Sequence, residues 1–485
     1  MRSTIRTRIA PSPTGLFHIG TARAALFNYL YAKKNGGQFI LRIEDTDKER
    51  SKKEFEDDIF NGLSWLGIIP DEGPKEGGMY GPYRQSERLL FYVKAVDRLL
   101  AEGNAYYCFH DDYYLEQEKK RLLAEKKPPI HECEYRELSL KEAEQKKETL
   151  SSFVIRFKSP KERTVAFKDH IRGPISFQSD LLGDFSIARD VAEPLYNLAV
   201  VVDDHEMNIT HVIRGEDHIS NTPKQILIAE ALSYPLPEYA HLPLILGADR
   251  AKLSKRHGAT SVADFRAAGY LPDAMVNFMA FLGWNPGDER EFFLLSELEN
   301  EFSLEHVQKS GAVFNEQKLD SINSFYVKKR MPADLMPLIL PMFEAAQFPT
   351  ENKMLIESII AIEQPRVKKL TEVVENAGFF FALPEYGPEL LIWKDNSLDD
   401  VKRALKSAVF ILDELPPEDF TPTKLDAAFT AEIAVKFKNK GDLLWPLRVA
   451  LSGQKTSPGP YEIISALGKE ESLRRINEAI QKITL

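Results

Sequence analysis

The spacing of apolar residues alternates between strand-like and helix-like periods in the first part of the chain. Residues 5–10 fit a short strand, which two prolines and a glycine then break. Apolar residues recur at helical spacing over 22–30, and the glycine pair at 36–37 is typical of a helix C-terminus. A second apolar strand follows at 39–43. This order predicts a βαβ unit with a parallel sheet.

The pattern changes between about residues 106 and 194. A charged helix over 115–127 is followed by short strand-like pieces at 153–157, 164–167 and 175–177. We interpret this stretch as an insertion.

The parallel-sheet pattern resumes after the insertion. The apolar run 198–202 predicts a buried strand that ends in two aspartates, and residues 209–214 predict another strand. Thr222 offers an N-cap, with Pro223 at the first helical position. We therefore expect one α/β domain that is split by the insertion.

Strand patterns fade after about residue 325. Apolar residues at helical spacing mark an amphipathic helix over 367–377, and proline-rich joints lie at 415–423 and 457–460. This pattern predicts an all-helical C-terminal region.

Composition narrows the class of protein. The chain has 485 residues, which at about 150 residues per domain suggests three domains. Its formal net charge of −10 is not that of a bulk nucleic-acid binder, so a nucleic acid would need a local basic face. Two cysteines imply no disulfide framework. The N-terminus lacks the apolar core of a signal peptide, and no apolar stretch could span a bilayer. We expect a cytoplasmic protein without membrane contact.

Two segments carry candidate chemistry. The loop 11–20 combines prolines and glycines and contains His18 and Gly20. The loop follows the carboxyl end of a strand, which is where α/β proteins bind ligands. His18 could therefore donate hydrogen bonds to phosphate oxygens, and Gly20, which has no Cβ, could let a nucleotide approach the backbone closely. The second segment, 252–258, places three cations in five positions, which suits phosphoryl chemistry. The alternative for the loop 11–20 is a structural turn with a capping histidine, and the alternative for 252–258 is a solvated charged loop.

Together these segments resemble the HIGH and KMSKS signatures of class I aminoacyl-tRNA synthetases. With further segments, they look like bacterial glutamyl-tRNA synthetases over about the first two-thirds of the chain, and more loosely through the C-terminal helices. The matching segments are His18-Ile19-Gly20-Thr21, Lys252-Leu253-Ser254-Lys255-Arg256, the run from Arg8 to Gly15, the run from Arg42 to Asp47, Val202 to His205, Val212 to His218, and Trp445 to Arg448.

The resemblance implies a Rossmann-like α/β class I catalytic domain with an α+β insert, followed by an all-α anticodon-binding region. It implies a catalytic domain over 1–105 and 195–240, an acceptor-end-binding insert over 106–194, a stem-contact domain over 241–325 and an anticodon-binding domain over 326–485. The implied reaction joins L-glutamate and ATP, with Mg²⁺, into glutamyl-adenylate. The glutamyl group then moves to the 3′ end of tRNA-Glu. Enzymes of this family need the tRNA to activate glutamate.

The resemblance also assigns roles to individual residues. The implied catalytic residues are His18, Lys252 and Lys255. The implied ATP-binding residues are Pro11, Thr14, Gly15, His18, Gly20, Lys252, Leu253, Ser254, Lys255 and Arg256. The implied glutamate-binding residues are Arg8, Ser12, Glu44, Tyr196 and Arg214. Arginine forks suit the two carboxylates of glutamate, and a glutamate side chain suits its ammonium.

Two pairs of potential zinc ligands lie in the insertion. They are Cys108 with His110, and His131 with Cys133. Some relatives carry zinc in this region on a Cys-x-Cys and Cys-x-His arrangement, but Tyr135 stands here where the last histidine would fall. The sequence therefore assigns no metal ligand and leaves open whether these four residues bind zinc.

Several alternatives stay open. The enzyme could also glutamylate tRNA-Gln. A glutaminyl-tRNA synthetase is disfavoured because an amide substrate would leave Arg214 unpaired and because that family has β-barrels in place of C-terminal helices. A truncated paralogue that modifies a tRNA base would lack the C-terminal third. A non-catalytic tRNA-binding protein should have lost its phosphate-handling residues. A monomer is the family expectation.

Overall fold

The computed structural model describes residues 4–150, 152–254, 256 and 258–484. The chain divides into two compact units. The first comprises Met1–Ala267 and Pro272–Leu319, and the second comprises Ala268–Leu271 and Asp320–Leu485.

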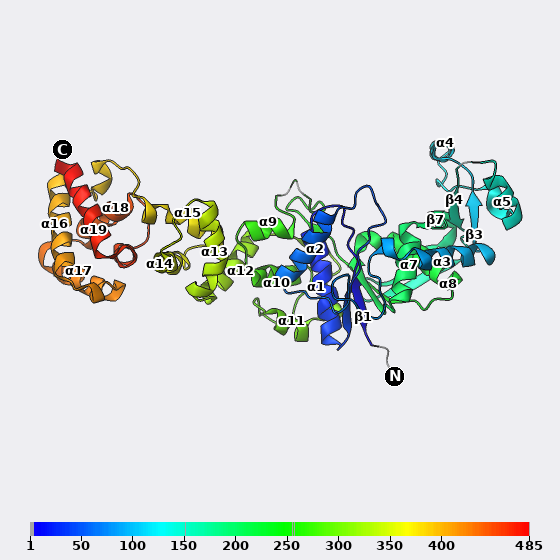
Figure 1. Cartoon of the computed structure of the whole chain (residues 1–485), viewed down its shortest axis with the longest axis horizontal. Helices are drawn as coiled ribbons and strands as arrows, with labels where there is room; N and C mark the ends of the chain where they lie inside the picture. The colour runs from blue at the N-terminus through cyan, green and yellow to red at the C-terminus, as the bar shows by residue number, and fades with distance from the viewer. Residues whose placement is uncertain (1–3, 151, 255, 257, 485) are drawn as a thin grey trace. The chain divides into compact units, whose positions relative to one another are not determined.

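A βαβ unit opens the first compact unit, as the sequence predicted. Strand β1 (Arg6–Ile9) leads through a loop into helix α1 (Ile19–Lys34), which lies against β1 and returns to strand β2 (Gln38–Leu41) (Figure 1). The two strands pair in parallel, with Arg6 beside Gln38 and Ile9 beside Leu41. All four residues of β1 are buried, which fixes the start of the following loop in the core.

A four-stranded sheet of order β6-β5-β10-β9 lies next to this unit, since Thr210 donates its backbone N–H to Arg6 O over 3.0 Å. Strands β9 (His211–Gly215) and β10 (Glu238–Leu242) are parallel. The antiparallel hairpin of β5 (Thr164–Asp169) and β6 (Gly173–Gln178) extends the sheet through β10. Two strands of the predicted insertion therefore belong to the same sheet as β9 and β10.

The rest of the predicted insertion forms its own antiparallel sheet of order β3-β4-β7-β8. Its helices include the predicted charged helix, which is observed as α4 and has no buried residue. The elements of this part are β3 (Ala105–Cys108), α4 (Asp112–Ala124), α5 (Leu140–Lys147), β4 (Val154–Phe157), α6 (Ser179–Leu182), β7 (Phe185–Asp190) and β8 (Glu193–Pro194).

Two sequence predictions are wrong here. The apolar run 198–202 lies in helix α7 (Tyr196–Glu206) and not in a strand. A short, continuously apolar run gives no period, so a buried helix and a buried strand look alike in sequence. Thr222 is the first residue of helix α8 (Thr222–Ala231), and Asn221 precedes it at the N-cap position. Thr222 already has helical backbone angles, and its hydroxyl accepts a hydrogen bond from Arg214 Nη2 over 2.8 Å.

The remaining elements of the first unit are mainly helical. They are α2 (Lys53–Trp65), α3 (Leu89–Ala101), β11 (Ile245–Leu246), α9 (Val262–Ala267), α10 (Pro272–Phe281), α11 (Leu295–Glu301) and β12 (Ala312–Val313), with β11 and β12 forming a two-stranded parallel sheet.

The second unit is built from helices, as predicted, and its described residues contain no strand. The helices are α12 (Glu316–Lys329), within which the unit begins, α13 (Pro332–Ala345), α14 (Lys353–Glu363), α15 (Leu370–Phe381), α16 (Leu398–Glu414), α17 (Pro422–Lys436), α18 (Lys440–Ser452) and α19 (Pro460–Thr484). The predicted amphipathic helix is α15, and both proline-rich joints separate helices. None of the helices formed by the described residues has the length and apolar character needed to span a bilayer.

A network of buried charges joins β1, β2 and α7 inside the first unit. The Arg42 side chain is fully buried. It donates from Nη1 to Asp204 Oδ1 over 2.7 Å and from Nη2 to Glu44 Oε1 over 3.2 Å. Asp204 also accepts from Arg8 Nε and Nη2, over 3.1 and 3.3 Å. Burial alone would raise the pKa of Asp204, but Arg8 and Arg42 hold that pKa below its usual value.

Substituting Arg42 tests the weight of this network. The change Arg42→Met should lower the free energy of unfolding by about 3–5 kcal/mol, because it leaves buried carboxylates without their cation. Urea denaturation measures the change. Arg50→Met is the matched control, since the ion pair of Arg50 with Asp47 is exposed and should contribute no more than about 1 kcal/mol. Equal losses in the two variants would contradict a structural role for the network.

Candidate functional site

A cavity of about 670 Å³ opens at the carboxyl ends of β1, β2, β9 and β10. This is the end at which open α/β sheets bind ligands. Ten of the predicted site residues line it, namely Arg8, Pro11, Ser12, His18, Gly20, Glu44, Tyr196, Arg214, Lys252 and Leu253. Segments separated by more than 200 residues in the chain thus meet in one cavity.

His18 stands at the start of helix α1. It occupies the N-cap position, and its Nδ1 accepts a hydrogen bond from the Gly20 backbone N–H over 3.0 Å. Ile19 donates its N–H to Thr260 O over 2.8 Å, just beyond the cationic segment. A Cβ on Gly20 would approach His18 Nδ1 to 3.3 Å, so glycine leaves room for the imidazole and for the cavity. Backbone pairing therefore holds the start of α1 against the chain that follows the cationic segment.

Arg8 and Glu44 enter the cavity from the buried charge network. Asp204 engages two nitrogens of Arg8, Nε and Nη2, and so fixes the plane of the guanidinium. Glu44 is held by Arg42. Burial raises the pKa of Glu44 against the opposing effects of Arg42 and Arg8. The cavity thus presents a fixed cation and a fixed acidic group side by side in the same network.

Arg214 is a buried cation without an acidic partner among the described residues. Its Nε donates to His241 Nε2 over 3.2 Å and its Nη2 to Thr222 Oγ1 over 2.8 Å, so both partners are uncharged acceptors. Its Nη1 is buried and has no hydrogen-bond partner in the described part of the chain. Burial is the main cause that lowers the pKa of Arg214. An anion bound in the cavity would supply the missing counter-charge and acceptor.

Tyr196 reaches the cavity from the first residue of α7. Its hydroxyl lies 2.9 Å from His218 Nδ1. Burial, and next the nearby charge of Arg214, lower the pKa of His218 to about 4. His218 is therefore neutral at pH 7, and its ring nitrogen can fix the orientation of the Tyr196 hydroxyl.

The cationic segment is only partly placed in the cavity. Lys252 lines it and donates to Asp217 Oδ2 over 3.0 Å. Thr14, Gly15, Ser254 and Arg256 do not line it, and Arg256 pairs instead with Asp249 over 3.2 Å. Lys255 lies outside the described residues.

Several side chains that line the cavity were not predicted from the sequence. Asp217 and His218 belong to a segment that was recognised, so its motif was a usable signal. Arg23 gave no such signal because it sits in the apolar run of α1. Its Nη1 and Nη2 donate to the backbone oxygens of Leu282 and Pro243, over 2.8 and 2.5 Å.

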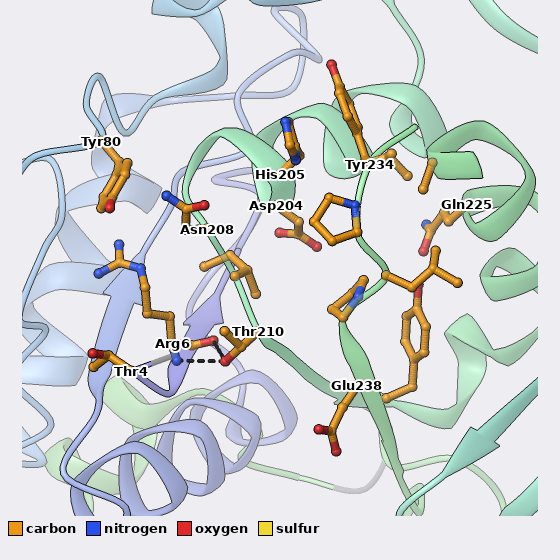
Figure 2. A pocket seen from close by; sticks show the side chains of 17 residues that line it. Thr4, Arg6, Tyr80, Asp204, His205, Asn208, Thr210, Gln225, Tyr234 and Glu238 are labelled. Carbon is orange, nitrogen blue, oxygen red and sulfur yellow. Dashed lines mark hydrogen bonds between the residues drawn. The ribbon is translucent and has the colours of Figure 1, made fainter. Parts of the chain in front are cut away.

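A second cavity, of about 520 Å³, lies at the opposite, amino-terminal ends of β1, β9 and β10. Figure 2 shows Arg6, Asp204, His205 and Glu238 around it. Its charged groups already have partners: Arg6 pairs with Glu72, Asp204 with Arg8, and Glu238 with His170. None of the predicted site residues that the structure describes lines this cavity, so we do not place the active site there.

The four potential zinc ligands of the insertion come together in space. One ligand atom from each of Cys108, His110, His131 and Cys133 lies within 4.8 Å of the others. Cys108 Sγ lies 3.6 Å from both His110 Nδ1 and His131 Nε2, and Cys133 Sγ lies 3.7 Å from His110 Nδ1. Tetrahedral zinc with ordinary Zn–S and Zn–N bonds would place sulfur and nitrogen about 3.6 Å apart.

The surroundings of this cluster also suit a metal. The second ring nitrogen of His131 contacts the Glu118 carboxylate, an arrangement that commonly orients zinc-bound histidines. Tyr135 packs on His110, with 5.0 Å between ring centroids, and takes no ligand position. His131 therefore provides the fourth potential ligand that the expected spacing lacked.

Comparison with known proteins agrees with this geometry. Residues 4–321 match the family of tRNA synthetases class I (E and Q), catalytic domain, and residues 333–480 match an anticodon binding domain. The chain is 44% identical to the glutamate–tRNA ligase of Carboxydothermus hydrogenoformans, over 97% of this chain and 99% of that protein. It is 42% identical to that of Geobacter sulfurreducens, over 99% of both.

A solved structure is similar over the same extent. The glutamate tRNA ligase of Elizabethkingia meningosepticum, crystallised in complex with its amino acid, has a TM-score of 0.88 at 33% identity and covers 99% of both chains. The family match spans the cavity at the strand ends and all of its lining residues. The chain therefore belongs to the class I tRNA synthetases of the glutamate and glutamine group.

Proposed function

We propose that this enzyme is a glutamate–tRNA ligase, which activates L-glutamate with ATP and transfers it to the 3′ end of tRNA-Glu. The observation that carries the choice of amino acid is Arg214, a buried guanidinium with no acidic partner in the described chain. A substrate carboxylate would pair with it, whereas the amide of glutamine would leave the cation uncompensated at a cost of several kcal/mol.

The site residues divide according to the charges of the substrates. We assign Arg8 and Arg214 to the two carboxylates of glutamate and Glu44 to its ammonium group. The hydroxyl groups of Ser12 and Tyr196 would form hydrogen bonds with the same substrate. Pro11, Gly20, Leu253 and His18 line the part of the cavity that we assign to ATP. From the sequence motifs we also assign Thr14, Gly15, Ser254, Lys255 and Arg256 to ATP.

In the first step, a carboxylate oxygen of glutamate bonds to the α-phosphorus of ATP. The bond from that phosphorus to the bridging oxygen of the β-phosphate breaks, and pyrophosphate leaves with the electron pair. The protein contributes positioning and positive charge from His18, Lys252 and Lys255. Mg²⁺ would enter on the ATP phosphates, since the cavity carboxylates Glu44 and Asp217 are already paired with Arg42 and Lys252.

The domain roles and the assembly complete the proposal. The insert over 106–194 would bind the acceptor end, the region 241–325 the acceptor stem, and the helical region 326–485 the anticodon. The enzyme acts as a cytoplasmic monomer. A non-discriminating enzyme that also charges tRNA-Gln would use the same amino-acid pocket.

An amino-acid panel tests the proposed function. Exchange of labelled pyrophosphate into ATP should appear with glutamate and tRNA-Glu together, and not with glutamine. It should also be absent with glutamate alone, because the family requires the tRNA. Exchange supported by glutamine, or by another amino acid in preference to glutamate, would contradict the proposal.

Removing the buried cation should weaken the binding of glutamate and leave the binding of ATP nearly unchanged. Arg214→Ala is expected to raise the KM for glutamate by about 10²-fold or more, the order of losing a buried charged partner. The KM for ATP should change far less, because Arg214 is assigned to the amino acid alone. Steady-state aminoacylation with each substrate varied measures both values. Equal increases would refute the assignment.

We further propose that Cys108, His110, His131 and Cys133 bind one structural zinc ion. Elemental analysis of the purified full-length protein should find about one zinc per chain, and the double variant Cys108→Ser/Cys133→Ser should hold almost none. His306→Asn is the matched control, since this histidine lies outside the cluster. A zinc-supplemented wild-type protein that still contains no zinc, or a double variant that retains it, would contradict the site.

A further inference from the structure

Two buried titratable residues lie behind Arg214 and have no role in the proposed reaction. They are Asp169, at the end of β5, and His241, in β10, and both are almost fully buried. The parallel register places His241 beside Arg214 and Tyr239 beside Asp169. The three side chains form one line, with 2.6 Å from Asp169 Oδ2 to His241 Nδ1 and 3.2 Å from His241 Nε2 to Arg214 Nε.

The hydrogen-bond donors in this line fix where the imidazole proton lies. Arginine can only donate, so His241 Nε2 must accept from Arg214 Nε–H. The proton of a neutral His241 is then on Nδ1, where it is donated to Asp169. Burial lowers the pKa of His241, against the opposing effect of Asp169, so the neutral form prevails at pH 7. The observed contacts therefore select one tautomer.

Asp169 is required as a carboxylate because it accepts four hydrogen bonds. Its Oδ2 accepts from His241 Nδ1 and from the His241 backbone N–H, over 2.6 and 3.0 Å. Its Oδ1 accepts from the backbone N–H groups of Ile171 and Arg172, over 2.9 and 2.7 Å. An asparagine has only one accepting oxygen, and its NH₂ group can only donate. In this position the NH₂ group would therefore face hydrogen-bond donors in place of an acceptor.

We propose that Asp169 and His241 are positioning residues for the amino-acid pocket, because they hold the Arg214 guanidinium in the orientation that offers Nη1 to a carboxylate of glutamate. His241 takes Nε and Thr222 takes Nη2, which leaves Nη1 for the substrate. This inference rests on the proposed function, and it extends the pocket to two residues that do not line the cavity.

The line of Asp169, His241 and Arg214, which we call the relay, also connects the pocket to the β5–β6 hairpin. Asp169 is the last residue of β5, and its Oδ1 holds the turn that leads into β6. Arg172 in that turn pairs with Glu216, whose Oε1 accepts the N–H of the cavity residue Leu244 over 2.7 Å. The orientation of Arg214, the arginine assigned to a carboxylate of glutamate, thus depends on a hairpin from the predicted acceptor-end insert.

The test is steady-state aminoacylation by the full-length enzyme with glutamate and ATP varied separately. Asp169→Asn should raise the KM for glutamate by about 10- to 100-fold, the effect of losing a hydrogen bond that orients a charged group. The KM for ATP and kcat should stay within about 3-fold, because neither Asp169 nor His241 lines the cavity. On the pocket side, His241 contacts only Arg214 and Thr222 among the described residues. Asp190→Asn, an exposed aspartate at the end of β7, is the matched control and should behave as wild type.

A double substitution separates positioning from a general structural effect. In an Arg214→Lys background the ammonium has no Nε–H to direct, so Asp169→Asn should cause little further increase in the KM for glutamate. A wild-type glutamate KM in Asp169→Asn, or the full increase again in the Arg214→Lys background, would overturn the relay. Failure of the wild-type enzyme to glutamylate tRNA-Glu would instead overturn the proposed function.

A pair of His241 variants decides the matter if Asp169→Asn does not fold. His241→Gln retains an oxygen that can accept from Arg214, whereas His241→Leu retains none. The relay predicts a glutamate KM near the wild-type value for the glutamine variant and a raised KM for the leucine variant. Equal glutamate KM values in the two variants would overturn the proposal.

Discussion

The amino-acid pocket depends on the buried charge network of Arg42, Asp204, Arg8 and Glu44. Arg42 is fully buried and holds both carboxylates, while Asp204 fixes Arg8 through two nitrogens. Charges in such a place are costly unless each is paired. Their mutual pairing keeps a cation and an acidic group ionisable inside the protein and immobile at the edge of a cavity. This is the preorganisation that binding a small zwitterion requires.

Arg214 completes the pocket by a different physical route. Arg8 is compensated by Asp204 within the protein, but Arg214 is held only by uncharged acceptors, His241 and Thr222. The first arginine is stable whether or not substrate is present. Arg214 lacks a counter-charge and a hydrogen-bond acceptor for Nη1, and a bound anion would supply both. Affinity and selectivity for a carboxylate therefore arise from one buried group. Burial keeps His241 neutral, and the hydrogen bond from His241 Nδ1 to Asp169 keeps its accepting nitrogen directed at Arg214, so this deficit is preserved.

The sequence was sufficient for the elements whose signals are local. The βαβ unit and the C-terminal helices followed from periodicity, and the grouping of Arg8, Glu44 and Arg214 followed from the resemblance to the synthetase family. The segment 198–202 was assigned wrongly because a buried helix without polar positions shows no period. Thr222 was assigned to the cap position because the sequence could not show that the helix includes Thr222 and is preceded by Asn221 at the N-cap.

Other parts of the site could not be predicted because they depend on tertiary pairing. Asp169 and His241 stand outside every recognised motif, and only the order of strands β5, β10 and β9 brings them to Arg214. The Cys108 and His131 pairs were visible as candidates, but their approach to within ligand distance is a property of the folded insertion. The positions of Thr14, Gly15, Ser254 and Arg256 away from the cavity were likewise not evident from the motif.

A crystal structure of the enzyme with L-glutamate tests the central claim most directly. The account predicts one carboxylate about 3 Å from Arg214 Nη1 and the other beside Arg8, with both guanidinium groups still bound to their present partners. The ammonium should lie against Glu44. Glutamate bound elsewhere, or an Arg214 side chain that turns away from His241 to meet it, would contradict the account.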